Sequence, residues 1–325
     1  MSSSTRTTPW LLGAAACAAI GCGADERASL PGRVDAGADA SVAVVSTPDP
    51  PDAGAGVCQK MDILFVIDDS GSMSEEQAGL VQSFPAFVSV LDSFKVQGGG
   101  LLDYRVAVTT TGRDVTYSLK TTPPMPEFVI PMNQKGMNGV LRQDCGMSRR
   151  WIERGDANVA STFGCVAHVG TTGPGVEMPL LAAELALGDR VKDGTNAGFL
   201  RDDALLAIVF ITDEEDCSRR DNDFIELNDM CEVASPNVIA PSHFVQFLDA
   251  TKKGAGRWAA AAIAGPGVCQ SAFGSAYEAA RLKEFVTLAG PSAVFSSICA
   301  GSFANALEDA LGTFTAACRA FPPPK

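Results

Sequence analysis

Residues 62–73 read DILFVIDDSGSM and join a short apolar run to a set of oxygen-bearing side chains. The run at 63–67 is apolar throughout and is followed by turn-forming residues, which predicts a strand buried on both faces of a sheet. Asp68, Ser70 and Ser72 then alternate along the chain. A carboxylate and hydroxyls are hard donors, which suit Mg²⁺, Mn²⁺ or Ca²⁺ better than zinc. The stretch therefore indicates either a cation site at the end of a strand or an ordinary acidic turn.

This D-x-S-x-S motif after a buried strand resembles the metal-ion-dependent adhesion site (MIDAS) of von Willebrand factor type A (VWA) domains, as in bacterial VWA lipoproteins. The resemblance implies two further ligands, a Thr and an Asp on later loops. It also implies that the hydroxyls contact the cation directly, that the Asp residues often act through water, and that a partner's carboxylate fills the open position. The implied cofactor is Mg²⁺, with Ca²⁺ or Mn²⁺ as alternatives.

The expected Thr lies in the glycine-rich turn at 169–175, which reads VGTTGPG and precedes an apolar helix expected at about 176–187. Thr171 and Thr172 both qualify, and the sequence does not choose between them. A phosphate-binding loop is the alternative for such a turn, but no Lys-Ser or Lys-Thr pair follows it.

The expected Asp is Asp213, which follows a strongly apolar strand predicted at 204–212. The chain continues through Glu214, Glu215 and Asp216 and is more acidic here than VWA domains usually are. Three interpretations of this acidic run stay open. They are a solvated loop, a second calcium-type site, and an enlarged negative field around the first metal.

Apolar strands alternate with amphipathic helices along the rest of the chain. Further strands are predicted at 104–111, 115–119, 258–264 and 293–298, and helices around 74–94, 244–248, 278–288 and 303–318. The sequence Ser72-Met73-Ser74-Glu75 has the form of a helix capping box, and Pro85 predicts a kink or break in the helix that follows. The alternation predicts an α/β fold of three layers, with a doubly wound, mostly parallel sheet, helices on both faces, and disulfide staples.

The N-terminal part divides into a leader and a tether. Residues 1–21 have a basic start, a short apolar middle and small residues before the break, as an export signal does. The ending Ile20-Gly21-Cys22 resembles a bacterial lipobox, which would lipidate Cys22, although Ala19 stands where Leu is usual; secretion after cleavage nearby is the alternative. Residues 22–57 are rich in Ala, Asp and Pro and predict a flexible tether. We expect an exported protein of the bacterial cell envelope, lipid-anchored in the outer membrane.

The folded, VWA-like domain is expected at 58–321, with a tail at 322–325. It contains an irregular stretch at 121–170, with several Pro and Gly residues, which is too long for an ordinary connection between elements. We expect an insertion with local structure of its own, which serves either as a surface that recognises a ligand or as padding.

The cysteines indicate the redox environment. Ten are present, of which Cys17 and Cys22 lie in the N-terminal apolar stretch, and no C-x-x-C pair occurs, so zinc-ribbon and thioredoxin-like sites lose their main support. An even number in an exported chain predicts disulfides, although the remaining cysteines allow on the order of a hundred pairings. The proposed pairs are Cys58–Cys318, Cys145–Cys165, Cys217–Cys231 and Cys269–Cys299.

Charge narrows the range of partners. The formal net charge of −13 argues against nucleic acid and against anionic membrane surfaces. His168 and His243 lie too far apart in sequence for a local zinc motif, and each is expected to be an ordinary surface or loop residue.

Three functions fit these observations. The preferred one is a surface-tethered module that binds a protein or glycan ligand, offering a carboxylate, through a divalent cation. The second is a metal-dependent hydrolase, for which Glu214 and Glu215 are near in sequence but no Ser-His-Asp set or placed general base is present. The third is a disulfide-stapled structural domain with a vestigial metal site. We therefore assign no enzymatic activity.

Overall fold

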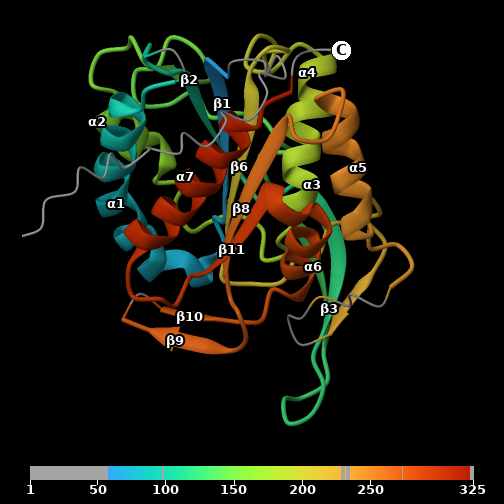
Figure 1. The fold of residues 1–325 in the computed structure, drawn as a ribbon. Coiled ribbons are helices and arrows are strands. Elements are labelled where there is room, and N and C mark those ends of the chain that lie inside the picture. The colour runs from blue at the N-terminus through green and yellow to red at the C-terminus, as the bar shows by residue number, and fades with distance from the viewer. Residues whose placement is uncertain (1–57, 97–98, 228–230, 232–234, 273, 323–325) are drawn as a thin grey trace, which may run out of the picture. The chain divides into compact units, whose positions relative to one another are not determined.

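A six-stranded sheet lies at the centre of the folded unit in this computed structural model, which describes residues 58–96, 99–227, 231, 235–272 and 274–322 (Figure 1). The leader, Cys22 and the tether lie outside the described residues. The strand order is β11-β8-β6-β1-β2-β5. The strands are β1 (Lys60–Ile67), β2 (Asp103–Thr110), β5 (Ile152–Glu153), β6 (Leu205–Ile211), β8 (Trp258–Ala264) and β11 (Ala293–Ser297).

The register of the sheet aligns the carboxyl ends of its central strands. All neighbouring pairs are parallel except β5, which runs antiparallel to β2. Ile67 of β1 is level with Thr110 of β2 and with Ile211 of β6. The residues that follow Ile67, Thr110 and Ile211 therefore leave the sheet side by side at the carboxyl ends of these strands. As predicted from its apolar run, β1 is buried on both faces.

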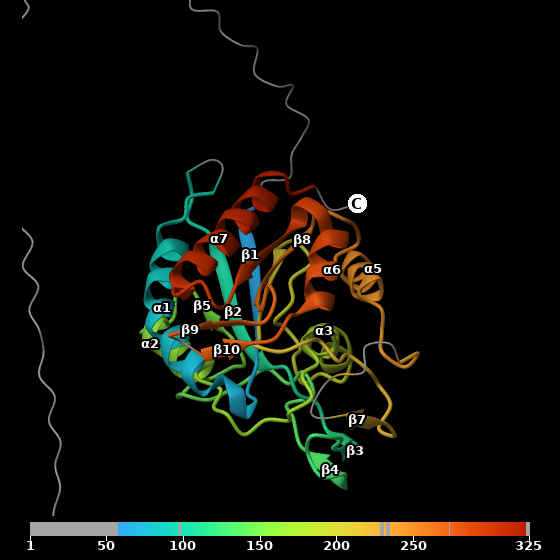
Figure 2. The ribbon, with the colours of Figure 1, turned by 90° about the horizontal axis from the view of Figure 1, so that it is seen from below.

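Helices lie on both sides of this sheet, because alternate side chains of each strand point to opposite faces (Figures 1 and 2). Phe65 belongs to one apolar core with helices α1 (Ser74–Ser93), α2 (Val159–Ala167) and α7 (Phe303–Arg319). Val66 belongs to the other core, whose helices are α3 (Pro179–Glu184), α5 (Pro241–Thr251) and α6 (Ala280–Ala289). The structure is thus a mixed α/β fold with a mostly parallel central sheet flanked by helices.

Smaller elements complete the fold. A π-helical turn and a short helix continue α3, and two 3₁₀ turns precede α1 and β11. These are η2 (Leu185–Asp189), α4 (Arg190–Lys192), η1 (Gly71–Met73) and η3 (Gly290–Ser292). Strands β9 (Cys269–Ser271) and β10 (Gly274–Ala276) form a two-stranded ribbon.

The strand expected at 115–119 forms, but it does not join the central sheet. It is β3 (Val115–Lys120), which pairs with β4 (Val129–Gln134) and β7 (Ile225–Leu227) in a separate three-stranded sheet. The first helix runs unbroken from Ser74 to Ser93 through Pro85, which excludes the break but leaves the kink a prediction.

The stretch at 121–170 is neither padding nor only a surface. It supplies β5 to the edge of the central sheet and α2 to one core. Phe163 of α2 is fully buried, and its ring centroid lies 4.9 Å from that of Phe65 and 4.3 Å from that of Phe84. Part of the expected insertion is therefore integral to the fold.

The described residues contain four disulfides. They join Cys58–Cys318, Cys145–Cys165, Cys217–Cys231 and Cys269–Cys299, the pairs proposed from the sequence. Disulfides on this scale indicate an exported protein. Among the described residues, no helix combines the length and apolar character needed to cross a membrane.

Candidate metal centre

Asp68 stands where β1 ends and is held on all sides. Its N–H donates to the carbonyl of Ile211 (2.9 Å), which continues the pairing with β6 by one residue. Its Oδ1 accepts from the N–H of Ser70 (2.8 Å) and its Oδ2 from the hydroxyl of Thr212 (2.6 Å). The Gln77 side chain donates to its carbonyl (2.9 Å). The carboxylate is fully buried and fixed in one orientation.

The two serines connect Asp68 to Asp213. The hydroxyl oxygens of Ser70 and Ser72 lie 2.9 Å apart, and the Ser72 hydroxyl donates to Asp213 Oδ1 at 3.2 Å. Four of the predicted ligands, Asp68, Ser70, Ser72 and Asp213, thus form one hydrogen-bonded group, which we call the Asp68 cluster. No three His, Cys, Asp or Glu side chains converge as a metal site in the described part of the chain. The Asp68 cluster offers two carboxylates and relies on hydroxyls for its other oxygen donors.

The predicted capping box is not formed. The 3₁₀ turn Gly71–Met73 intervenes before α1, and the N-cap residue of α1 is Met73, which makes no side-chain cap. The Ser72 hydroxyl instead contacts acceptors of the β6 loop, Asp213 and Glu214. The Ser72 hydroxyl therefore bonds to these nearby carboxylates and does not cap the helix.

The loop that contains Thr171 and Thr172 contacts the residues after β1 at Gly173. The N–H of Gly173 donates to the carbonyl of Asp69 (2.7 Å), and a Cβ at Gly173 would collide with the Asp69 carboxylate. Thr171 is half-buried and Thr172 is exposed. Within the described residues, neither hydroxyl makes a hydrogen bond to the Asp68 cluster, so their role as ligands stays a prediction.

Glu177 is a buried acid at the cluster that the sequence analysis missed. It is 1% exposed, and its Oε1 has no hydrogen-bond partner among the described residues. Burial, the negative charge of Asp68 and that of Glu214 raise its pKa well above the usual range, and it is hydrogen-bonded to Glu214. A lone acid within the apolar sequence VEMPLLAA was the available signal.

Glu76 is a second missed acid, in the first turn of α1. It is 2% exposed, its Oε2 has no hydrogen-bond partner in the described residues, and Gly274 of β10 approaches so closely that a Cβ there would collide with it. Burial, with Glu75 and Asp68 nearby, raises its pKa to about 7. Its signal was its place one turn before Leu80, on the apolar stripe of the helix.

Among the described residues, no arginine or lysine forms an ion pair with Asp68 or Asp213. Burial, Asp68 and Glu214 raise the pKa of Asp213 to about 8, and burial raises that of Asp68. Elsewhere in the fold, the buried carboxylate of Asp62 lies 2.7 Å from the guanidinium of Arg201. Buried charges without such a partner are costly. Oxygen donors that gather without a positive partner fit a divalent cation by charge and by chemistry.

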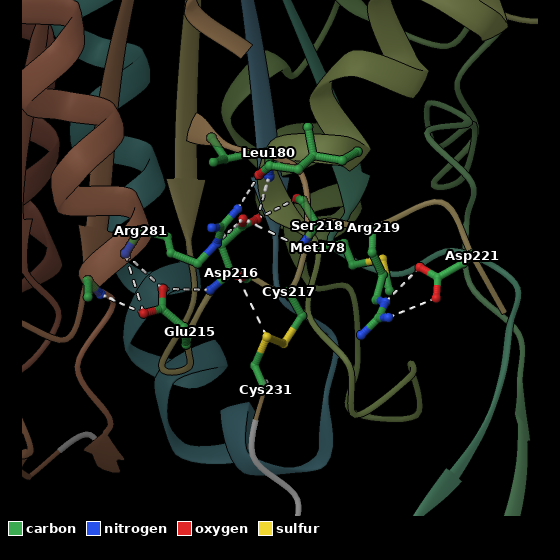
Figure 3. The surroundings of a disulfide bond; sticks show 12 residues. Met178, Leu180, Glu215, Asp216, Cys217, Ser218, Arg219, Asp221, Cys231 and Arg281 are labelled. Carbon is green, nitrogen blue, oxygen red and sulfur yellow. Dashed lines mark hydrogen bonds and ion pairs between the residues drawn. A yellow bond between two sulfur atoms is a disulfide. The ribbon is translucent and has the colours of Figure 1, made fainter. Parts of the chain in front are cut away.

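Within the acidic run, Glu215 has a structural task. Its carboxylate accepts from the backbone N–H of Ala280 (2.9 Å) and of Arg281 (3.0 Å) at the start of α6 (Figure 3). A carboxylate at a helix N-terminus satisfies unpaired N–H groups and complements the helix dipole. It is therefore a helix cap, and the solvated-loop interpretation is wrong for this residue.

Asp216 is also a structural acid and is fully buried. It accepts from the N–H of Leu180 (3.2 Å) and the hydroxyl of Ser218 (2.6 Å), and its Oδ2 lies 3.2 Å from Arg281 Nε (Figure 3). The solvated-loop interpretation is wrong here too, and the second calcium-type site stays a prediction. Only Glu214 of the run faces the Asp68 cluster, at 3.5 Å from the Ser72 hydroxyl.

The uncompensated acids make the stability of the metal-free protein depend on pH. A carboxyl group with a raised pKa in the folded state stabilises the fold fully below its ordinary pKa, 3.8 for Asp and 4.5 for Glu. That contribution is lost as the pH rises through the folded pKa, about 8 for Asp213 and about 7 for Glu76. Stability in EDTA should therefore fall across this window.

One pH unit of pKa displacement corresponds to about 1.4 kcal/mol. We expect the free energy of unfolding in EDTA to be lower by at least that amount at about pH 8 than at about pH 5. Urea unfolding followed by circular dichroism at both pH values measures the difference. Equal or greater stability at the higher pH would contradict the raised pKa values.

Comparison with known proteins finds similarity only among solved structures. No family model and no curated protein matches the chain. Proximal thread matrix protein 1 from the mussel byssus is 14% identical, with a TM-score of 0.39, over 81% of this chain and 49% of that one. The human COPII-coat protein Sec24c is 10% identical, with a TM-score of 0.39, over 79% and 32%. The pilus adhesin RrgA from Streptococcus pneumoniae is 13% identical, with a TM-score of 0.27, over 52% and 22%. The chain thus spans half or less of the length of each protein.

Proposed function

We propose that this protein is a VWA-type module that binds a protein or glycan ligand through a divalent cation at a MIDAS-like site. The hydrogen-bonded Asp68 cluster carries the proposal, because it gathers residues 141 positions apart at one edge of the sheet. Asp68, Ser70, Ser72 and Asp213 would hold Mg²⁺, Ca²⁺ or Mn²⁺, with Thr171 or Thr172 from the adjoining loop.

The strand order supports the finer assignment. Numbered along the chain, the central strands lie in the order 3-2-1-4-5-6 from β5 to β11. This order is that of doubly wound sheets, which bind ligands beyond the carboxyl ends of the strands where the order reverses. In this sheet the reversal falls between β1 and β6, the strands that end at Asp68 and Asp213.

The side chains of the cluster explain how such a site would act. Ser70 and Ser72 are neutral donors, so a bound cation keeps part of its charge for an oxygen of the partner. Asp68 is locked by the Ser70 N–H and the Thr212 hydroxyl and cannot swing away. Ser72 is exposed, which opens the cluster to a macromolecular partner at this point.

The proposed location follows from the disulfides and the leader. Four disulfides agree with export. Cleavage before Cys22 and its lipidation would attach the module to a membrane, and the tether would hold it away from that surface. Mass spectrometry of the mature N-terminus tests the anchor, and an unmodified residue other than Cys22 would refute it.

Calorimetric titration of the full mature chain with Mg²⁺, Ca²⁺ and Mn²⁺ tests the site. We expect saturable binding whose affinity Asp68→Asn lowers more than about 100-fold. This loss is larger than that usually caused by changing a residue that only hydrogen-bonds to a metal ligand. The substitution is nearly isosteric; it removes the charge and replaces one of the two acceptor oxygens with an NH₂ donor. Asp202→Asn is the matched control, because Asp202 is 79% exposed near the opposite end of β6.

The partner is sought with the same pair of variants. In a pull-down, we expect wild-type and Asp202→Asn protein to retain a protein or glycan partner. We expect this retention to be lost when EDTA is added and when Asp68→Asn protein is used. Equal metal affinity in Asp68→Asn and wild-type protein would refute the site.

A further inference from the structure

A cavity of about 430 Å³ lies at the carboxyl ends of β1 and β2. Its lining includes Asp69, the residue after Asp68, and Thr110, the last residue of β2, which are 9% and 1% exposed. Val169, at the start of the glycine-rich turn 169–175, lines it as well. The cavity therefore adjoins the Asp68 cluster, and a ligand at the cluster could extend into it.

The other wall of this cavity comes from the stretch at 121–170. The residues of that wall are Met137, Arg142, Gln143, Asp144 and Arg150. The wall is fastened to the rest of the fold at two points. The backbone N–H of Arg142 donates to the carbonyl of Val108 in β2 (2.8 Å), and the bond between Cys145 and Cys165 joins the wall to α2. A wall held in this way is formed before any ligand arrives, as small-molecule sites usually are.

Arg150 carries the positive charge that the wall leaves unneutralised. The other arginine, Arg142, is paired with Asp144, at 2.7 Å between Nη2 and Oδ2. Arg150 is half-buried and donates through Nη1 to the carbonyl of Leu141 (2.7 Å), and it forms no ion pair with any described residue. Its guanidinium has further N–H donors, so an anionic group that enters the cavity can bind it.

The cavity also offers acceptors and neutral polar groups. Asp69 forms no ion pair within the described part of the chain, and its Oδ1 has no hydrogen-bond partner there. Gln143 is exposed, and its amide provides both a donor and an acceptor. Hydroxyl groups can donate to the Asp69 carboxylate and accept from Gln143. The lining therefore suits a ligand that combines several hydroxyls with one acid, which is the chemistry of a uronic acid.

We propose that this cavity binds one uronic acid unit of an acidic glycan, with its carboxylate on Arg150 and its hydroxyls on Asp69 and Gln143. The inference rests on the proposed function, because the same glycan would reach the cation with another of its oxygens. The volume lies in the range of small-molecule sites, roughly 300–1,000 Å³. An acidic side chain of a protein partner would also reach Arg150, but it would bring no hydroxyls for Asp69.

Calorimetry of the full mature chain in Mg²⁺, with trigalacturonate and trimannuronate as probes, tests the cavity. We expect wild-type protein to bind at least one trimer, and Arg150→Met to lower that affinity at least about tenfold, the usual cost of losing hydrogen bonds to a charged group. The methyl ester of the same trimer has no charge. It should bind wild-type protein at least about tenfold more weakly than the acid does, and Arg150→Met should not weaken it further.

Two further variants separate recognition from damage to the wall. Arg150→Lys keeps the charge but loses the planar pair of donors, so its affinity should lie between those of wild-type and Arg150→Met protein. Arg319→Met is the matched control, because Arg319 is exposed at the end of α7, beside the Cys58–Cys318 bond and before the start of β1. It should bind the trimer as wild-type protein does. The comparison of acid with methyl ester uses wild-type protein and needs no variant to fold.

The outcomes separate the two proposals. If the wild-type protein binds no divalent cation, the proposed function fails, and trimer binding in EDTA then tests the cavity by itself. If Mg²⁺ binds but neither trimer does, or if Arg150→Met binds the trimer as tightly as wild-type protein, only the role of the cavity is overturned. Tighter binding of tetraglutamate than of either trimer would overturn the choice of a glycan over a protein.

Discussion

Replacing Arg281 by Met is expected to lower the free energy of unfolding by about 3–5 kcal/mol, the usual cost of removing one partner of a buried ion pair. Arg281 is the positive partner of the fully buried Asp216, which also binds the N–H of Leu180 ahead of α3. Without Arg281, the Asp216 carboxylate would stay in the interior with no counter-charge. Urea unfolding of the two proteins measures the loss.

A second variant shows whether the buried charge is responsible. Asp216→Asn combined with Arg281→Met removes both charges, so the pair should lose less stability than Arg281→Met alone. Lys283→Met is the control on the same helix, because the Lys283–Glu278 pair is 33% and 55% exposed. It should cost no more than about 1 kcal/mol. An additive double variant would argue against the ion pair.

Phe163→Ala is expected to destabilise the protein by about 3–5 kcal/mol. The ring of Phe163 is fully buried and contacts three others, those of Phe65, Phe84 and Phe87, at centroid distances of 4.9, 4.3 and 6.1 Å. Truncation would leave a cavity between β1 and two helices, which the surrounding side chains fill only in part.

The control for Phe163→Ala is a substitution at an exposed residue of the same helix, α2. Ser161 of α2 is exposed, so Ser161→Ala should change the free energy of unfolding by less than about 0.5 kcal/mol. Thermal and urea unfolding of both variants make the measurement. If Phe163→Ala were as mild as Ser161→Ala, α2 would be an appendage and not part of the core.

The central strands could be predicted because their signals are local. An unbroken apolar run such as that of β6 specifies a strand buried on both faces without knowledge of its neighbours. The contribution of the stretch at 121–170 is different. Strand β5 has two residues and α2 follows an irregular, glycine-containing segment, so neither shows a sustained period. Their place in the sheet and core depends on contacts with distant elements.

The same distinction separates the residues of the candidate site. Asp68, Ser70 and Ser72 form a compact motif, and Asp213 follows an obvious strand. Glu177 lies 109 positions after Asp68 and becomes its neighbour only when α3 packs on the sheet. The acidic run shows that similar neighbours in sequence can have different roles. Glu214 faces the Asp68 cluster, Glu215 caps the start of α6, and Asp216 pairs with Arg281.

The bond between Cys58 and Cys318 has a mechanical consequence. It joins the entry of the described chain to its last helix, across 260 positions. A pulling force applied through the segment before Cys58 would be shared between β1 and α7, because Cys58 is covalently joined to both. The point of loading lies before β1, whose 8 residues span about 25 Å, and the Asp68 cluster lies after it. A force between the segment before Cys58 and a partner bound at the cluster would therefore act at opposite ends of the central strand β1.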